Sequence, residues 1–272
     1  MRRSLLLPLL LLTACGDKDT DTGEEADTDT DTDTASLTYE VVDQGTADAG
    51  FFALLRPSVF YFTIEVQAAL GGDKCPEQVE KDDILVSLEG NGCTDNNGYV
   101  WTGSRTMAFE ESSETEAELI LMYDNLSAQS ETDGIALDGE MRLLATGPDL
   151  DEGLWSGTEA TGLTITTTDS TGSFPLYYRE YALSGDVGSM LLEGGAGELT
   201  VSGQVEVVGL GYAGLSGSIS STGSCPREFA DSGTLVLTGG NVTTYTFDGA
   251  KSCDGCIPFS TDDGLEGEFC DL

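Results

Sequence analysis

The chain has 272 residues, enough for one large β domain or two small ones. It carries 49 acidic against 11 basic side chains, a net charge of −38, which excludes nucleic acid and bare anionic phospholipid as partners. The sequence has no histidine, so Ser-His-Asp and Cys-His catalysis and imidazole metal sites are excluded as well. The excess of acid otherwise serves to keep a surface protein soluble.

The first 14 residues have the pattern of a cleavable export signal. Arg2 and Arg3 give a positive start, and residues 5–12 form an apolar run. A membrane-spanning helix needs about 20 apolar residues, so this run is too short to span. Residues 12–15 then read LTAC and end at Cys15, which resembles the lipobox of bacterial lipoproteins.

The resemblance implies that the Cys15 thiol carries a diacylglycerol and that signal peptidase II cleaves before it. Two or more acyl chains make such an anchor stable, so the expected partner is a membrane, reached through lipid. Gly16 rather than Asp follows the cysteine. The best-known inner-membrane retention signal is therefore absent, and the outer membrane is the expected location. The alternative is an ordinary signal peptide with Cys15 there by chance.

Residues 16–36 form an acidic tether, so the chain divides into a signal at 1–14, a lipidated Cys15 and tether at 15–36, and a β-rich domain at 37–272. The tether holds nine acids and one lysine, with almost nothing apolar. Such a segment cannot offset its ordering entropy, and we expect it to stay disordered. Stretched out, it would reach about 70 Å. Weak divalent cation binding by its carboxylates is the alternative role.

From Leu37 onward, short runs of alternating apolar and polar residues predict β-strands. They lie at 84–88, 118–122, 140–144, 163–167, 198–208, 234–237 and 243–247. Residues 238–242 read TGGNV, a good hairpin connection between the last two. The expected fold class is all-β, an antiparallel meander that curls into a barrel-like or sandwich domain.

Residues 51–70 are long and apolar and read FFALLRPSVFYFTIEVQAAL before Gly71 and Gly72. A helix ending at a glycine cap would cover one face of the sheet. Alternation between Phe60 and Val66 favours a strand instead, and Pro57 interrupts any long helix. The helix is the slightly favoured prediction, and a second membrane span is not expected.

Three pairs of short segments suggest an internal duplication. Residues 98–103 (GYVWTG) resemble 153–157 (GLWSG), 126–128 resemble 183–185, and 139–141 resemble 197–199. The pairs are 54 to 58 residues apart, so two repeated β modules could pack side by side. Chance likeness among glycine-rich strands is the alternative. Trp101 and Trp155 are expected to be core residues.

Six cysteines remain after Cys15, and an even number in an exported chain predicts three disulfides. Short loops favour the pairs Cys75–Cys93, Cys225–Cys253 and Cys256–Cys270. Each would stabilise the fold by roughly 3 kcal/mol. Two alternatives concern the C-terminal cysteines: a redox pair in the CDGC segment at 253–256, and a zinc site that adds Cys225 and Cys270.

No residue pattern identifies a catalytic, cofactor-binding or metal-binding residue, so no cofactor is expected. Asp231-Ser232-Gly233 resembles the motif of aspartic proteases but lacks a second copy outside the tether, and it is interpreted as a turn. The acidic segments at 95–98 and 149–153 are likewise interpreted as turns rather than calcium loops.

Three functional hypotheses follow. The favoured one is a non-enzymatic structural or binding module of the bacterial envelope, whose protein or glycan partner the sequence does not identify. The second is a carrier of an apolar ligand in an open β-barrel, as in folds that carry lipoproteins. The third is an envelope hydrolase with two carboxylates about 5–10 Å apart.

Overall fold

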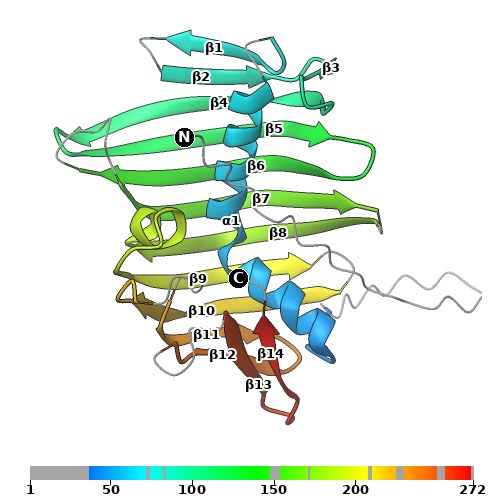
Figure 1. Cartoon of the computed structure of the whole chain (residues 1–272), viewed down its shortest axis with the longest axis vertical. Helices are drawn as coiled ribbons and strands as arrows, with labels where there is room; N and C mark the ends of the chain where they lie inside the picture. The colour runs from blue at the N-terminus through cyan, green and yellow to red at the C-terminus, as the bar shows by residue number, and fades with distance from the viewer. Residues whose placement is uncertain are drawn as a thin grey trace, which may run out of the picture.

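A computed structural model describes residues 37–71, 74–81, 84–147, 154–170, 172–207, 210–224, 230–249 and 255–270. They form one long helix, a π-helical turn and a 14-stranded antiparallel sheet (Figure 1). The elements are α1 (Gln44–Gly71), β1 (Glu77–Lys81), β2 (Ile84–Glu89), β3 (Cys93–Thr94), β4 (Val100–Ser113), β5 (Glu116–Gln129), β6 (Gly134–Thr146), β7 (Leu154–Asp169), β8 (Gly172–Gly185), η2 (Gly188–Leu192), β9 (Gly197–Val207), β10 (Gly211–Ser221), β11 (Ser232–Thr238), β12 (Val242–Phe247), β13 (Cys256–Thr261) and β14 (Glu266–Cys270).

The strands follow one another across the sheet in chain order, from β1 at one edge to β14 at the other. Only β3 leaves this path, as a short strand paired with β4. The all-β class and the antiparallel meander are therefore confirmed. The sheet is open and does not close into a barrel, and α1 lies across one of its faces as the second layer (Figure 1).

The predicted strands all fall on observed ones, and the predicted hairpin joins β11 to β12. The strands β4 to β8 are 13 to 16 residues long, much longer than the runs that alternation identified. Their alternation is broken in mid-strand by β-bulges, where the pairing register shifts by one residue.

Beside these bulges, residues with a positive φ angle line up across six neighbouring strands. They are Gly103, Asn125, Gly139, Gly162, Glu180 and Gly203 in β4 to β9. At Gly139 the φ angle is 116°, and a Cβ would collide with the carbonyl oxygen of Gly162 on the neighbouring strand. Bulges bend a strand and increase its twist, so this line, which we call the crease, curves the sheet.

Helix α1 crosses the strands on the concave face, close to the crease. Its contacts move steadily across the sheet: Ala47 meets Tyr245 of β12, Ala53 meets Tyr178 of β8, and Ser58 meets Thr158 of β7. Glu65 then reaches Arg105 of β4, and Ala68 reaches Gln78 of β1. One helix thus covers the inner side chains of most of the sheet, which would otherwise face water.

A capping box starts α1. The Thr46 amide donates to the Asp43 carboxylate at 2.8 Å, and the Thr46 hydroxyl oxygen accepts from the Asp43 amide at 3.1 Å. This pairing satisfies donors that the first helical turn leaves open. The helix therefore begins several residues before the apolar run that marked it in the sequence.

The predicted helix at 51–70 is confirmed, and its residues lie inside α1. By length and apolar composition α1 could cross a membrane, but 53% of its most apolar window is buried within the fold. The alternation over residues 60–66, which favours a strand, is wrong as a guide here, because this segment lies within α1. Tyr61 packs on Trp155 of β7, and Phe60 lies against Arg56.

The matched segments of the proposed duplication fall on β4 and β7, on β5 and β8, and on β6 and β9. The third pair is not equivalent in register. Gly139 lies within β6, opposite Tyr123, whereas Gly197 begins β9 and pairs with Ser221 of β10. The strands of the two segments also belong to one continuous sheet. Trp101 is fully buried, as expected, and Trp155 is partly buried.

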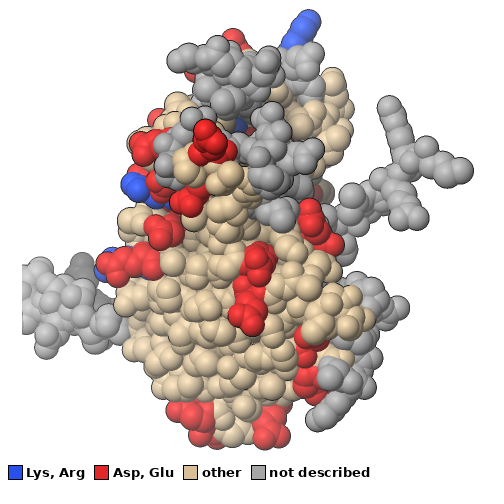
Figure 2. Space-filling model, turned by 90° about the vertical axis from the view of Figure 1, so that its left-hand side faces the viewer, with Lys and Arg blue, Asp and Glu red and all other residues tan. Residues whose placement is uncertain are grey.

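On the side of the molecule shown in Figure 2, acidic side chains lie in small groups and basic ones are few. Neutral side chains dominate the lower part of this view. On the outer face of the sheet, serine and threonine hydroxyls pair between neighbouring strands, as in Thr200 with Ser218 at 3.0 Å. This face is polar and fits contact with water.

Candidate functional site

Two of the three predicted disulfides are present. Cys75, just before β1, is joined to Cys93 of β3, and Cys256 of β13 is joined to Cys270 of β14. Each ties an edge of the sheet, where strands have a partner on one side. The third predicted pair, Cys225–Cys253, lies outside the described residues, as does the predicted lipidation site Cys15.

The disulfide at Cys256 bears on both alternatives for the C-terminal cysteines. Because Cys256 is bonded to Cys270, it does not form the CDGC redox pair with Cys253. The sulfur atoms of Cys256 and Cys270 lie near a carboxylate oxygen of Glu268, within the reach of one metal ion. A zinc site needs thiolates, however, and the disulfide leaves none at these two positions.

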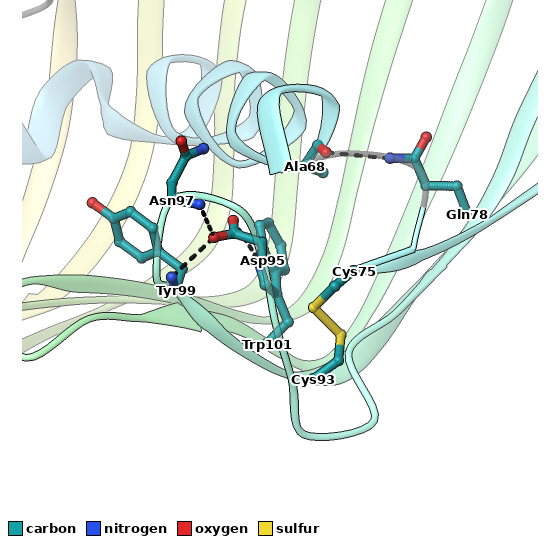
Figure 3. Close-up of a disulfide and its surroundings, with 8 residues drawn as sticks. All are labelled: Ala68, Cys75, Gln78, Cys93, Asp95, Asn97, Tyr99 and Trp101. Atoms are coloured by element: carbon teal, nitrogen blue, oxygen red, sulfur yellow. Dashed lines mark hydrogen bonds between the residues drawn. A yellow bond between two sulfur atoms is a disulfide. The ribbon is translucent and has the colours of Figure 1, made fainter.

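The acidic turn at 95–98 packs beside the first disulfide and the C-terminal end of α1 (Figure 3). Asp95 accepts hydrogen bonds from the amides of Asn97 and Tyr99, at 2.8 and 2.9 Å. Its second oxygen accepts from the indole N–H of Trp101 at 3.0 Å. Asp95 is a buried anchor that fixes a turn and a core tryptophan, which agrees with the prediction of a turn.

Burial alone would raise the pKa of the Asp95 carboxyl group. The hydrogen bonds from Trp101, Tyr99 and Asn97 stabilise the charged form and outweigh burial, so the pKa lies below its ordinary value. Of the carboxylates in the described parts of the chain, Asp95 is the buried one, and both of its oxygens are occupied. These contacts use the carboxylate to hold the turn and the indole in place.

Asp231 of the DSG motif also serves a turn. Its carboxylate accepts from the amide of Thr222 at 2.8 Å, and its amide donates to the carbonyl of Ser220 at 2.9 Å. The residue thereby links the ends of β10 and β11. Its partners are a hydroxyl and backbone groups, whereas an aspartic protease needs a second aspartate.

A shallow polar depression lies where the β2–β3 turn meets β4. Its volume is about 490 Å³, and it is lined by Glu89, Asn91, Gly92, Thr102, Gly103 and Ser104. Glu89 is the one ionisable group of this lining. The hydrolase hypothesis requires two carboxylates facing each other, and this depression offers one.

The polar groups under α1 are arranged around two buried arginines. Arg105 of β4 is 1% exposed, and its guanidinium grips the Glu65 carboxylate of α1 with N–O distances of 2.7 to 3.0 Å. Such a two-pronged pair is strong and directional. Tyr61 and Tyr123 lie beside it, and burial raises the pKa of both hydroxyl groups.

The second buried arginine is Arg56 of α1, which is 9% exposed. Its guanidinium carbon lies 5.5 Å from the ring centre of Phe52 and 5.3 Å from that of Phe60, one helical turn away on either side. Its Nε–H is buried and has no hydrogen-bond partner. Burial lowers the pKa of the Arg56 guanidinium, and the nearby Tyr178 opposes that effect.

Sequence reasoning singled out none of Arg56, Glu65 and Arg105. Arg56 and Glu65 were visible as the two charges inside an otherwise apolar run at 51–70, and a buried helix rarely keeps charges without a reason. Arg105 gave no comparable signal, because β4 contains polar residues at many positions.

This chain matches no protein-family model, no curated protein and no solved structure.

Proposed function

We propose that this chain is a lipid-anchored protein of the bacterial envelope whose β domain acts as a non-enzymatic binding module. The diacylated Cys15 holds it in the outer membrane, and the acidic tether carries the domain away from the lipid surface. The observation that carries the proposal is the pairing of all four described cysteines in disulfides. Disulfides form and persist outside the cytoplasm, where a lipobox would send the chain.

The buried face of α1 supports a binding module over a carrier of apolar ligands. Phe51 stacks on Phe269 at 4.4 Å, and Leu54 and Ile64 are fully buried against the sheet. These side chains occupy the concave face that an open barrel would use to hold a lipid. A carrier would have to move α1 away from the sheet and break the contacts that cover the core.

The hydrogen bonds of the two motif-like aspartates support a non-enzymatic role. Asp95 and Asp231 hold turns in place. A carboxylate hydrolase needs acids that are free to exchange protons with a substrate. We therefore propose recognition rather than catalysis as the task of the domain.

Fractionation of cells that produce the wild-type chain or Cys15→Ser tests the proposal. We expect the wild type to incorporate labelled palmitate and to stay with outer membranes after a high-salt wash. The variant should incorporate none and become soluble or remain as an uncleaved precursor. Gly16→Asp is the matched control, because it should keep the label and shift the protein to the inner membrane. Equal membrane retention of Cys15→Ser without label would overturn the proposal.

A further inference from the structure

Arg56 and Arg105 are both buried under α1, but they differ in their partners. Arg105 is neutralised by Glu65 and tied to it by three hydrogen bonds. Among the described residues no carboxylate contacts Arg56, although the chain contains 49 acids. The contrast within one interface calls for a physical explanation.

A buried charge without a counter-charge is expensive, because it has lost its water and cation–π contacts return only part of that loss. Arginine cannot escape this cost by losing its proton at ordinary pH. Natural sequences usually remove such a group or place an acid beside it. A retained and unpaired guanidinium is therefore expected where an external anion supplies the missing charge.

The surroundings of Arg56 are apolar on two sides. Its guanidinium carbon lies over the rings of both Phe52 and Phe60, whose faces help to keep water from it. The hydroxyl of Tyr178, which interacts electrostatically with Arg56, donates to the carbonyl of Ala53 at 2.9 Å and is not free to serve as a counter-charge. The Nε–H is left as a buried donor without an acceptor.

We infer that Arg56 is the centre of an anion-binding site that takes a small oxyanion, a carboxylate or a phosphate group. The planar guanidinium presents donors that match two oxygens of such a group side by side. The rings of Phe52 and Phe60 offer apolar surface to whatever the group is attached to. This inference rests on the proposed binding role of the domain, but it is independent of the lipid anchor.

The test is a titration of the full chain carrying Cys15→Ser, folded with its disulfides formed, so that no attached acyl group interferes. The probes are decanoate in one arm and inorganic phosphate in the other. The readout is the Arg56 Nε–H resonance in a nitrogen–proton correlation spectrum, assigned by its loss in Arg56→Met. We expect a saturable shift of this resonance in at least one arm, and the responding arm identifies the source of the oxyanion.

Two variants make the outcome specific. Arg56→Met should weaken binding by at least about tenfold by calorimetry, because it removes charge-assisted hydrogen bonds. Arg179→Met should bind as the parent chain does, since Arg179 is an exposed arginine that also lies over an aromatic ring, Tyr177 at 6.0 Å.

Absence of a shift in both arms would overturn the inference, as would equal binding by Arg56→Met. If Arg56→Met does not fold, the titration of the parent chain still shows whether the anion binds. A chain that carries no lipid but binds the anion would contradict the proposed lipid anchor and support the site at Arg56. A lipidated chain that binds neither probe would support the anchor and contradict the site at Arg56.

Discussion

The hydroxyl group of Tyr178 donates a hydrogen bond to the carbonyl oxygen of Ala53 at 2.9 Å. Ala53 lies four residues before Pro57, so its carbonyl is the one that the proline leaves without an intrahelical donor. Tyr181 donates to the next carbonyl, that of Leu54, at 2.8 Å. Strand β8 thus replaces the helical hydrogen bonds that Pro57 disrupts, and α1 continues past the proline.

Replacing Tyr178 by phenylalanine should therefore destabilise the fold through the helix. We expect Tyr178→Phe to lower the free energy of unfolding by about 1–2 kcal/mol, because a buried carbonyl loses its donor. In a Pro57→Ala background the loss should be smaller, since the alanine N–H can pair with the Ala53 carbonyl. Urea denaturation of the two single variants and the double variant measures this coupling.

Tyr177→Phe is the control for that cycle. Tyr177 is the neighbour of Tyr178 in β8 and lies on the opposite face of the strand, where it is half-buried. Its replacement should cost little in either background. If Tyr178→Phe lowers the free energy of unfolding equally with and without Pro57, then the Tyr178 hydroxyl does not replace the hydrogen bond that the proline removes.

The buried pair of Glu65 and Arg105 predicts an asymmetric response to mutation. Arg105→Met should cost about 3 kcal/mol, because it leaves the Glu65 carboxylate unpaired in a mostly buried place. Adding Glu65→Leu should recover most of the loss, since the pair is then replaced by apolar packing. Thermal and urea unfolding measure both steps. Arg142→Met is the control and should change stability little, because its ion pairs with Glu118 and Glu140 are exposed.

The crease predicts that a methyl group is costly at one glycine and harmless at another. Gly139→Ala should destabilise by more than about 1 kcal/mol, because φ is positive there and the Cβ would meet backbone of β7. Gly157→Ala should be close to neutral, since a Cβ at that position makes only ordinary contacts. Urea unfolding compares the two, and equal effects would argue against a sterically fixed crease.

The lowered pKa of Asp95 predicts how the stability of the fold depends on pH. Its pKa is lower in the folded chain than its ordinary value of 3.8, so its contribution is complete above that pH. The contribution is lost as the pH falls through the folded pKa. Asp95→Asn should be less stable than the wild type at neutral pH and show a shallower fall below about pH 4. Unfolding curves of both proteins recorded over that range measure the difference.

Much of the fold could be predicted from the sequence, because the relevant signals are local. Alternation located strands such as β11 and β12, short loops gave the two disulfides, and a glycine-ended apolar run gave α1. The long strands were only partly recognised. Their bulges shift the alternation at Gly139 and its neighbours, and a glycine inside a strand has the same local signature as a turn.

The candidate site was less predictable, because it depends on contacts between distant residues. Nothing local shows that Glu65 meets Arg105, 40 residues away, or that Arg56 meets no acid. Pro57 weakened the prediction of a helix, and its compensation comes from Tyr178, far along the chain. Partner choice inside a core is set by the whole fold, which local propensity does not encode.

The most direct test of the account is the intact mass of the mature chain isolated from native membranes, before and after reduction and alkylation. The account predicts that the chain begins at Cys15, that this residue carries a diacylglycerol, and that the other six cysteines react with alkylating reagent only after reduction. An unacylated chain with a different first residue and freely reactive thiols would contradict it.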